Sequence, residues 1–154
     1  MKQIIAIGGG GFGRVIKDLK IERYIKSQSS KTNPKICFIP TATGDDQGYI
    51  DNFYKAFNEL ECETSHINFF KRTIDLKSHI LNQDIIYVGG GNTKSMLAVW
   101  KEWGLDLILE EAYQEGIIII INLSIILNTK NMFKNGLIMG HLLSVAAAEQ
   151  RLNI

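Results

Sequence analysis

The feature that most restricts the fold of this 154-residue chain is the alternation of short, unbroken apolar runs with longer amphipathic stretches. Strands that read as continuous apolar runs are buried on both faces, as in parallel sheets covered by helices. Short runs rich in apolar and β-branched residues predict strands at Ile4–Ile7, Lys35–Ile39, Glu63–Phe70, Asp84–Val88 and Ile117–Ile121.

The stretches between these runs carry apolar residues at helical spacing. They predict helices over Val15–Ser27, Tyr49–Leu60, Thr73–Asn82 and Thr93–Glu115, the last in two pieces hinged at Gly104. Strands that alternate with helices indicate βαβ units, and right-handed crossovers then favour a doubly wound, three-layer α/β/α sandwich with a mainly parallel sheet. No linker, repeat or low-complexity segment divides the chain, so we expect a single domain over residues 1–154.

Composition excludes several classes of protein. Hydrophobic residues make up 45% of the chain and charged residues 21%, which excludes a disordered chain, a collagen and a coiled coil. The net charge of +1 gives no basic excess for binding nucleic acid. No apolar run approaches the 18 or so residues of a membrane span, and the N-terminus lacks a signal-peptide pattern, so we expect a cytoplasmic protein without a membrane anchor. Cys37 and Cys62 lack metal-ligand spacing and are expected to be reduced and buried.

Ligands of doubly wound sheets bind beyond the carboxyl ends of the strands, where this chain is rich in glycine. The segment Gly8–Gly13 satisfies the pattern G-x-G-x-x-G of dinucleotide-binding loops. That pattern needs an acid at the end of the second strand, but Ile39 is followed by Pro40, and Asp45 comes too late. We therefore expect no cofactor and no metal; the loop either makes a tight turn or lets the backbone approach another ligand.

A second glycine loop, Gly89–Thr93, follows the fourth strand and opens a helix that Asn92 or Thr93 can cap. Its backbone N–H groups can hold an anion or an oxyanion. The alternative is a tight strand-to-helix turn with no ligand.

Ser124 lies just after the fifth strand, where a sharp turn into a helix would make it a nucleophile. The alternative is an ordinary helix cap. Of the three histidines, His66 and His79 fall in predicted secondary structure and are expected to be structural or exposed. His141 is the one imidazole downstream of Ser124, which makes it the candidate base.

Four separated segments of the chain together resemble one family. Met1–Phe12, Pro34–Ala42, Tyr87–Thr93 and Trp100–Asp106 resemble peptidase E, of the S51 family of serine peptidases, which includes aspartyl dipeptidases and their cyanophycinase relatives. The resemblance covers residues 1–121, whereas residues 122–154 diverge. It implies a fold similar to class I glutamine amidotransferases, which is flavodoxin-like. It also implies hydrolysis of small peptides with an N-terminal aspartate by a serine nucleophile with a histidine and an acidic partner.

The same resemblance implies roles for particular residues. The family's Gly-Gly-Gly-Asn loop, which helps to form the oxyanion hole, corresponds to Gly89, Gly90, Gly91 and Asn92. Its nucleophile elbow, Gly-x-Ser-Ala-Gly, corresponds to Asn122–Ile126, which makes Ser124 the nucleophile and the Ile125 N–H the second oxyanion donor. The family's histidine and acid correspond to no position in this chain.

The elbow departs from the family pattern in three places. Asn122 and Ile126 replace its glycines, and Ile125 is a β-branched residue that resists a strained backbone. We therefore expect impaired or lost activity, and the alternative is a non-catalytic α/β module or an inactive remnant of an S51 peptidase. We also expect the fifth strand to lie at a sheet edge, which is either exposed, covered by Asn135–Arg151 or buried in a homodimer.

Overall fold

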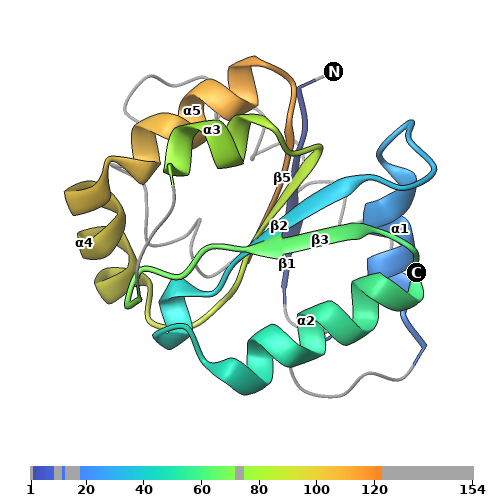
Figure 1. Ribbon diagram of the computed structural model, residues 1–154, viewed down its shortest axis with the longest axis horizontal. Helices are drawn as coiled ribbons and strands as arrows, with labels where there is room; N and C mark the ends of the chain where they lie inside the picture. The colour runs from blue at the N-terminus through green and yellow to red at the C-terminus, as the bar shows by residue number, and fades with distance from the viewer. Residues whose placement is uncertain (1, 9–11, 13–17, 72–74, 123–154) are drawn as a thin grey trace.

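The computed structural model describes residues 2–8, 12, 18–71 and 75–122 and is built around one parallel sheet (Figure 1). The strands are β1 (Ile4–Ile7), β2 (Lys35–Ile39), β3 (Glu63–His66), β4 (Ile85–Val88) and β5 (Ile118–Asn122). Their order across the sheet is β1-β5-β4-β2-β3, and every neighbouring pair is parallel.

Helices cover both faces of this sheet. One face packs against α1 (Lys20–Ser27) and α2 (Gln47–Glu59), and the other against α3 (Leu76–Leu81), α4 (Thr93–Trp103) and α5 (Leu105–Gln114). Figure 1 shows α3 and α5 on one side of the strands and α2 on the other. The three-layer α/β/α fold predicted from the sequence is confirmed.

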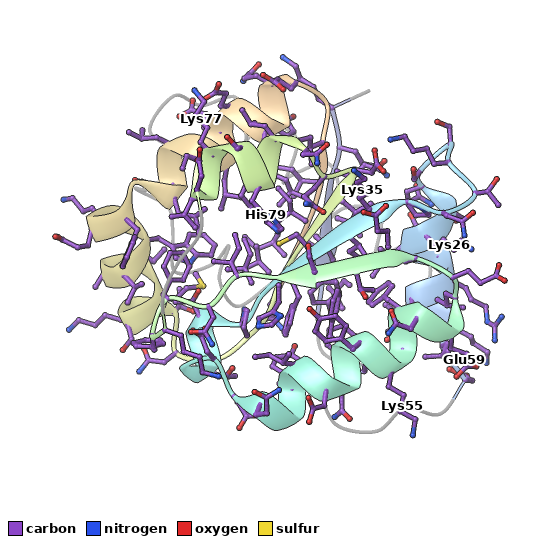
Figure 2. All side chains as sticks on the ribbon, in the orientation of Figure 1. Lys26, Lys35, Lys55, Glu59, Lys77 and His79 are labelled. Atoms are coloured by element: carbon purple, nitrogen blue, oxygen red, sulfur yellow. The ribbon has the colours of Figure 1, made fainter. Side chains whose placement is uncertain are left out.

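The isoleucine run of β5 explains why both faces are apolar. Ile119 and Ile121 point into the hydrophobic cluster under α3, α4 and α5, whereas Ile118 and Ile120 point into the cluster under α1 and α2. Alternate residues of a strand face opposite sides of the sheet, so a strand between two helical layers needs apolar residues at every position. Charged side chains such as Lys26, Lys55 and Lys77 lie at the periphery (Figure 2).

In α2, α3 and α4, the side chain of the residue before the helix accepts a backbone hydrogen bond from the first turn. The carboxylates of Asp46 and Asp75 and the carboxamide of Asn92 each accept the N–H of the residue three positions later, at 2.8, 3.1 and 3.1 Å. Such caps satisfy N–H groups that have no partner inside the helix. The predicted hinge at Gly104 is confirmed, because this glycine separates α4 from α5 with a φ of 66°.

The predicted third strand is too long. It ends at His66 rather than at Phe70, because its neighbour β2 stops at Ile39 and no longer offers hydrogen-bonding groups. Beyond that point, the N–H groups of Phe69 and Phe70 donate to the carboxylate of Asp45 instead, at 2.8 and 3.4 Å. For the helix predicted over Val15–Ser27, the described part of the chain shows α1 from Lys20 to Ser27.

The prediction that the fifth strand lies at a sheet edge is wrong. β5 lies between β1 and β4, with Ile121 paired to Ala6 on one side and to Val88 on the other. The five isoleucines signal burial, but burial on both faces does not reveal which strands are neighbours. Within the described part of the chain, the outer strands are β1 and β3, so the predicted homodimer loses the reason from which it was inferred.

Phe12 packs on the face of the sheet that α1 and α2 cover. Its side chain is 1% exposed, and its ring centroid lies 5.0–5.7 Å from five other aromatic rings. Those rings belong to Phe38, Tyr49, Phe53, Phe57 and Tyr87. Edge-to-face and tilted arrangements of this kind add to the free energy gained by burial.

Cys37 and Cys62 are buried and form no disulfide, as expected from the sequence. Across the described ranges, no helix is both long and apolar enough to cross a membrane.

Trp100 joins α4 to the end of β2, and its removal tests that junction. The buried indole N–H donates to the Thr41 hydroxyl at 3.2 Å, so Trp100→Phe removes this bond and leaves Thr41 without its donor. We expect the free energy of unfolding, measured with urea, to fall by about 1–3 kcal/mol. Trp103→Phe is the matched control because Trp103 is 44% exposed; an equal loss in both variants would contradict the role of this bond.

Candidate functional site

The strand order makes the connections that follow the neighbouring strands β2 and β4 diverge. The chain leaves β2 through α2 toward β3, but it leaves β4 through α4 and α5 toward β5, in the opposite direction and on the opposite face. Neighbouring strands whose connections diverge in this way form a topological switch point, where doubly wound folds bind ligands. The two segments at this point are the 3-10 turn η2 (Thr41–Thr43) and Gly89–Asn92.

Gly91 lies against the backbone of η2. The Asn92 N–H donates to the Ala42 carbonyl oxygen at 2.7 Å, and a Cβ added to Gly91 would lie 2.3 Å from that same oxygen. Gly91 also has a φ of 149°, which L side chains rarely adopt. This position therefore requires glycine for both space and backbone conformation.

The backbone N–H groups of the loop differ in whether they already donate to a partner inside the protein. Gly89 donates to the Ile39 carbonyl oxygen at 3.0 Å and Asn92 donates to Ala42, so both groups are used inside the protein. The Gly90 backbone interacts with the Tyr49 hydroxyl, which lowers the pKa of this phenol; burial is the larger effect and raises that pKa overall. Gly91 is exposed, and its N–H makes no backbone hydrogen bond to any described residue.

The loop leads directly into α4, whose N-terminus contributes a partial positive charge at the switch point. Asn92 caps this helix as predicted, with its side-chain oxygen accepting from Ser95. An 11-residue helix carries a partial positive charge at its N-terminus, so an anion at this end is favoured.

The end of β5 lies beside the same loop. A Cβ on Gly90 would lie 2.7 Å from Nδ2 and 3.0 Å from Cγ of Asn122, the last residue of β5. The structure thus brings the predicted loop Gly89–Asn92 next to the strand that leads to Ser124. Ser124, Ile125 and His141 themselves lie outside the described residues.

Two polar side-chain pairs lie on opposite faces of β3, the strand next to β2 at the sheet edge. The Tyr54 hydroxyl and His66 Nδ1 are 2.8 Å apart, and the Ser65 hydroxyl and His79 Nε2 are 3.1 Å apart. Both histidines are half-buried, as expected for structural residues, and Figure 2 shows His79 between α3 and the sheet. Burial lowers the pKa of each imidazole, although the nearby Asp45 opposes this for His66.

Asp45 links the segment after η2 to the segment after β3, because its carboxylate accepts the N–H groups of Phe69 and Phe70. Burial raises the pKa of its carboxyl group, although the hydrogen bonds from Phe69 and Phe70 oppose the rise. Its backbone is left-handed, with a φ of 57°.

Sequence reasoning did not predict which side chains contact the glycine loop: these include Phe38, Ala42, Tyr49 and Asn122. The first three come from β2, η2 and α2, and only the strand order brings them to the loop. Asn122 did carry a signal, because it ends a run of five isoleucines with a polar side chain. That signal indicates the end of a strand but not which segment the side chain contacts.

Comparison with known proteins identifies one family. The model of peptidase family S51 matches residues 4–121. A curated protein of Bacillus subtilis (strain 168), the uncharacterized peptidase YgaJ, is 52% identical over 120 residues, which are 77% of this chain and 52% of YgaJ. The chain therefore spans about half the length of this relative.

A solved structure supports the fold. The crystal structure of a protein from Listeria monocytogenes EGD-e, described as a candidate peptidase E, superposes with a TM-score of 0.62 at 23% sequence identity. The match covers 79% of this chain and 58% of that one.

Substitution of Gly91 tests the close approach between the loop and η2. Gly91→Ala places a methyl group against the Ala42 carbonyl oxygen and strains the backbone, so we expect the free energy of unfolding to fall by about 2–4 kcal/mol. Gly48→Ala is the control, because its nearest neighbour is an ordinary 3.4 Å contact and alanine favours the helix. If urea denaturation gave equal midpoints for the two variants, the tight contact at Gly91 would be wrong.

The half-buried histidines predict a loss of stability in mild acid. Their pKa values are lowered in the folded chain, so the unfolded chain binds more protons once the pH falls below about 6.5. Stability is then complete above this pH and decreases as the pH falls from 7 to 5; the raised pKa of Asp45 acts in the opposite direction. His79→Gln removes one titrating group but keeps a partner for Ser65. Urea unfolding at both pH values should show a smaller decrease for this variant than for the unsubstituted protein, and an equal decrease would contradict the assignment.

Proposed function

Because this chain belongs to peptidase family S51, we propose that it is a serine-type hydrolase of small peptides such as Asp-X dipeptides. Ser124 is the proposed nucleophile, and His141, the one imidazole downstream of it, is the candidate base. The observation that carries the proposal is the position of Gly89–Asn92 at the switch point, beside the end of β5.

Chain connectivity supports Ser124 as the partner of this loop. Only Leu123 stands between Ser124 and Asn122 in the sequence, so the two Cα atoms can be at most about 7 Å apart. Asn122 in turn lies against Gly90. A nucleophile and its oxyanion donors must both lie about 3 Å from the reacting carbonyl group, which requires this kind of proximity.

The hydrogen bonds of the loop narrow the proposed oxyanion hole. Of the four residues in the family's loop, Gly89 and Asn92 already donate to backbone carbonyl groups, and the Gly90 backbone interacts with the Tyr49 hydroxyl. We therefore assign the N–H of the fourth residue, Gly91, to the tetrahedral intermediate, with the Ile125 N–H as the second donor. The N-terminus of α4 favours the negative charge that develops there.

The proposed reaction follows from these groups. The Ser124 hydroxyl attacks the peptide carbonyl carbon while the base takes its proton, and the carbonyl oxygen becomes negative against the Gly91 and Ile125 N–H groups. The amine then leaves with a proton from the base, and water hydrolyses the acyl-enzyme to release aspartate. Because Ile125 is β-branched and both elbow glycines are replaced, we expect turnover to be slow.

Release of free aspartate from Asp-X dipeptides tests this function. We expect slow release by the unsubstituted protein and none above background in Ser124→Ala, because loss of the nucleophile removes the covalent step. Ser30→Ala is the control, since Ser30 is exposed in the connection between α1 and β2. Release that persists unchanged in Ser124→Ala would reject Ser124 as the nucleophile.

A second candidate function is that of a non-catalytic module that binds a small anion at the same switch point, beside Gly89–Asn92. The Asn122 side chain beside Gly90 favours it, because the family's elbow has glycine at this position. Isothermal titration with L-aspartate separates the two functions: binding without any release from dipeptides indicates the module, whereas Ser124-dependent release indicates the enzyme.

A further inference from the structure

Asn122 occupies the space beside the loop that a side chain at position 90 would fill. A Cβ built on Gly90 meets three atoms of Asn122 at 2.7, 3.0 and 3.4 Å, and no other atom is closer. Cβ atoms essentially never approach other heavy atoms within 3.0 Å. The carboxamide group of Asn122 therefore packs directly against the backbone of Gly90.

The sheet directs this side chain toward the loop. Asn122 follows Ile121 in β5 and pairs with Ile7 of β1, and Ile121 pairs with Val88, the last residue of β4. Asn122 is therefore the first residue of β5 beyond the end of β4, at the level where β4 turns into the loop. It is also half-buried, whereas the four isoleucines before it are buried.

The loop is supported from the other side by the end of β2. Gly91 lies against Ala42, and the Asn92 N–H donates to the Ala42 carbonyl oxygen. Because β4 lies between β5 and β2, these contacts and the Asn122 contact hold successive residues of the loop from opposite sides. The peptide group between Gly90 and Gly91 lies between the two supports.

We propose that Asn122 is a positioning residue for the Gly89–Asn92 loop: its carboxamide packs against Gly90 and so directs the Gly91 N–H toward the reacting carbonyl group. This inference rests on the proposed function, because it gives the contact between Asn122 and Gly90 a role in catalysis. Asn122 acts through the loop and does not itself contact the substrate in this proposal.

Steady-state kinetics on an Asp-X dipeptide test the positioning role. Loss of one oxyanion donor lowers kcat by about 10²–10³-fold in enzymes of this kind, so a misdirected donor should have a smaller effect of the same sign. We expect Asn122→Ala to lower kcat by about tenfold while KM changes by less than about threefold, since the donor acts mainly in the transition state. Asn58→Ala is the control and should leave both constants unchanged, because Asn58 is an exposed residue of α2 whose side chain accepts a hydrogen bond from Thr64 of β3.

A compensating pair makes the test specific to the contact. Gly90 does not have a positive φ, so alanine is compatible with its backbone, and the three atoms nearest to the new Cβ all belong to the Asn122 side chain. We expect Gly90→Ala alone to lower both kcat and the melting temperature. In the double variant Gly90→Ala/Asn122→Ala the new methyl group takes the place of the carboxamide, and most of the lost kcat should return.

Gly91→Ala is the matched comparison for this compensation. Its methyl group would meet the Ala42 backbone rather than Asn122, so Asn122→Ala should not restore either measurement in that background.

The outcomes separate the two proposals. If the unsubstituted protein releases no aspartate, the proposed function fails. If it releases aspartate but the effects of Gly90→Ala and Asn122→Ala on kcat are additive, the positioning role of Asn122 is overturned. Coupling in the melting temperature without coupling in kcat also overturns it, because the contact would then only stabilise the fold.

Discussion

The hydrogen bond from the Asn92 N–H to the Ala42 carbonyl oxygen joins the ends of two neighbouring strands whose connections diverge. It forms only because Gly91 has no side chain and adopts a φ of 149°. The same residue, Asn92, caps α4, and the indole N–H of Trp100 in α4 donates to Thr41, the neighbour of Ala42. The arrangement of the loop at the switch point thus depends on one short backbone contact.

The sequence predicted the layers and most elements of this fold. Unbroken apolar runs identified β1, β2, β4 and β5 to within one residue, and Gly104 correctly marked the break between α4 and α5. The end of β3 was missed because it depends on where β2 stops and on the carboxylate of Asp45, far away in the sequence. The place of β5 inside the sheet was missed because isoleucine reports burial and not the identity of neighbouring strands.

Less of the candidate site could be predicted. The glycine loop was recognised from its composition, and Asn92 was correctly identified as a helix cap. Which N–H groups remain for a ligand was not predictable, because Ile39 and Ala42 accept two of them only once the strands have paired. Asn122 was noticed as a departure from a family pattern, but its contact with Gly90 depends on the register between β4 and β5.

The two tryptophans of the chain differ in their exposure to water, which allows fluorescence to report on the switch point. Trp100 is enclosed and its indole N–H is bound to Thr41, in the turn adjoining the glycine loop, whereas Trp103 is partly in water. Indole emission shifts to longer wavelength in a polar environment, so we expect Trp100 to emit at shorter wavelength than Trp103. Trp100 is bonded to the turn beside the glycine loop, so its emission should respond to changes at the switch point.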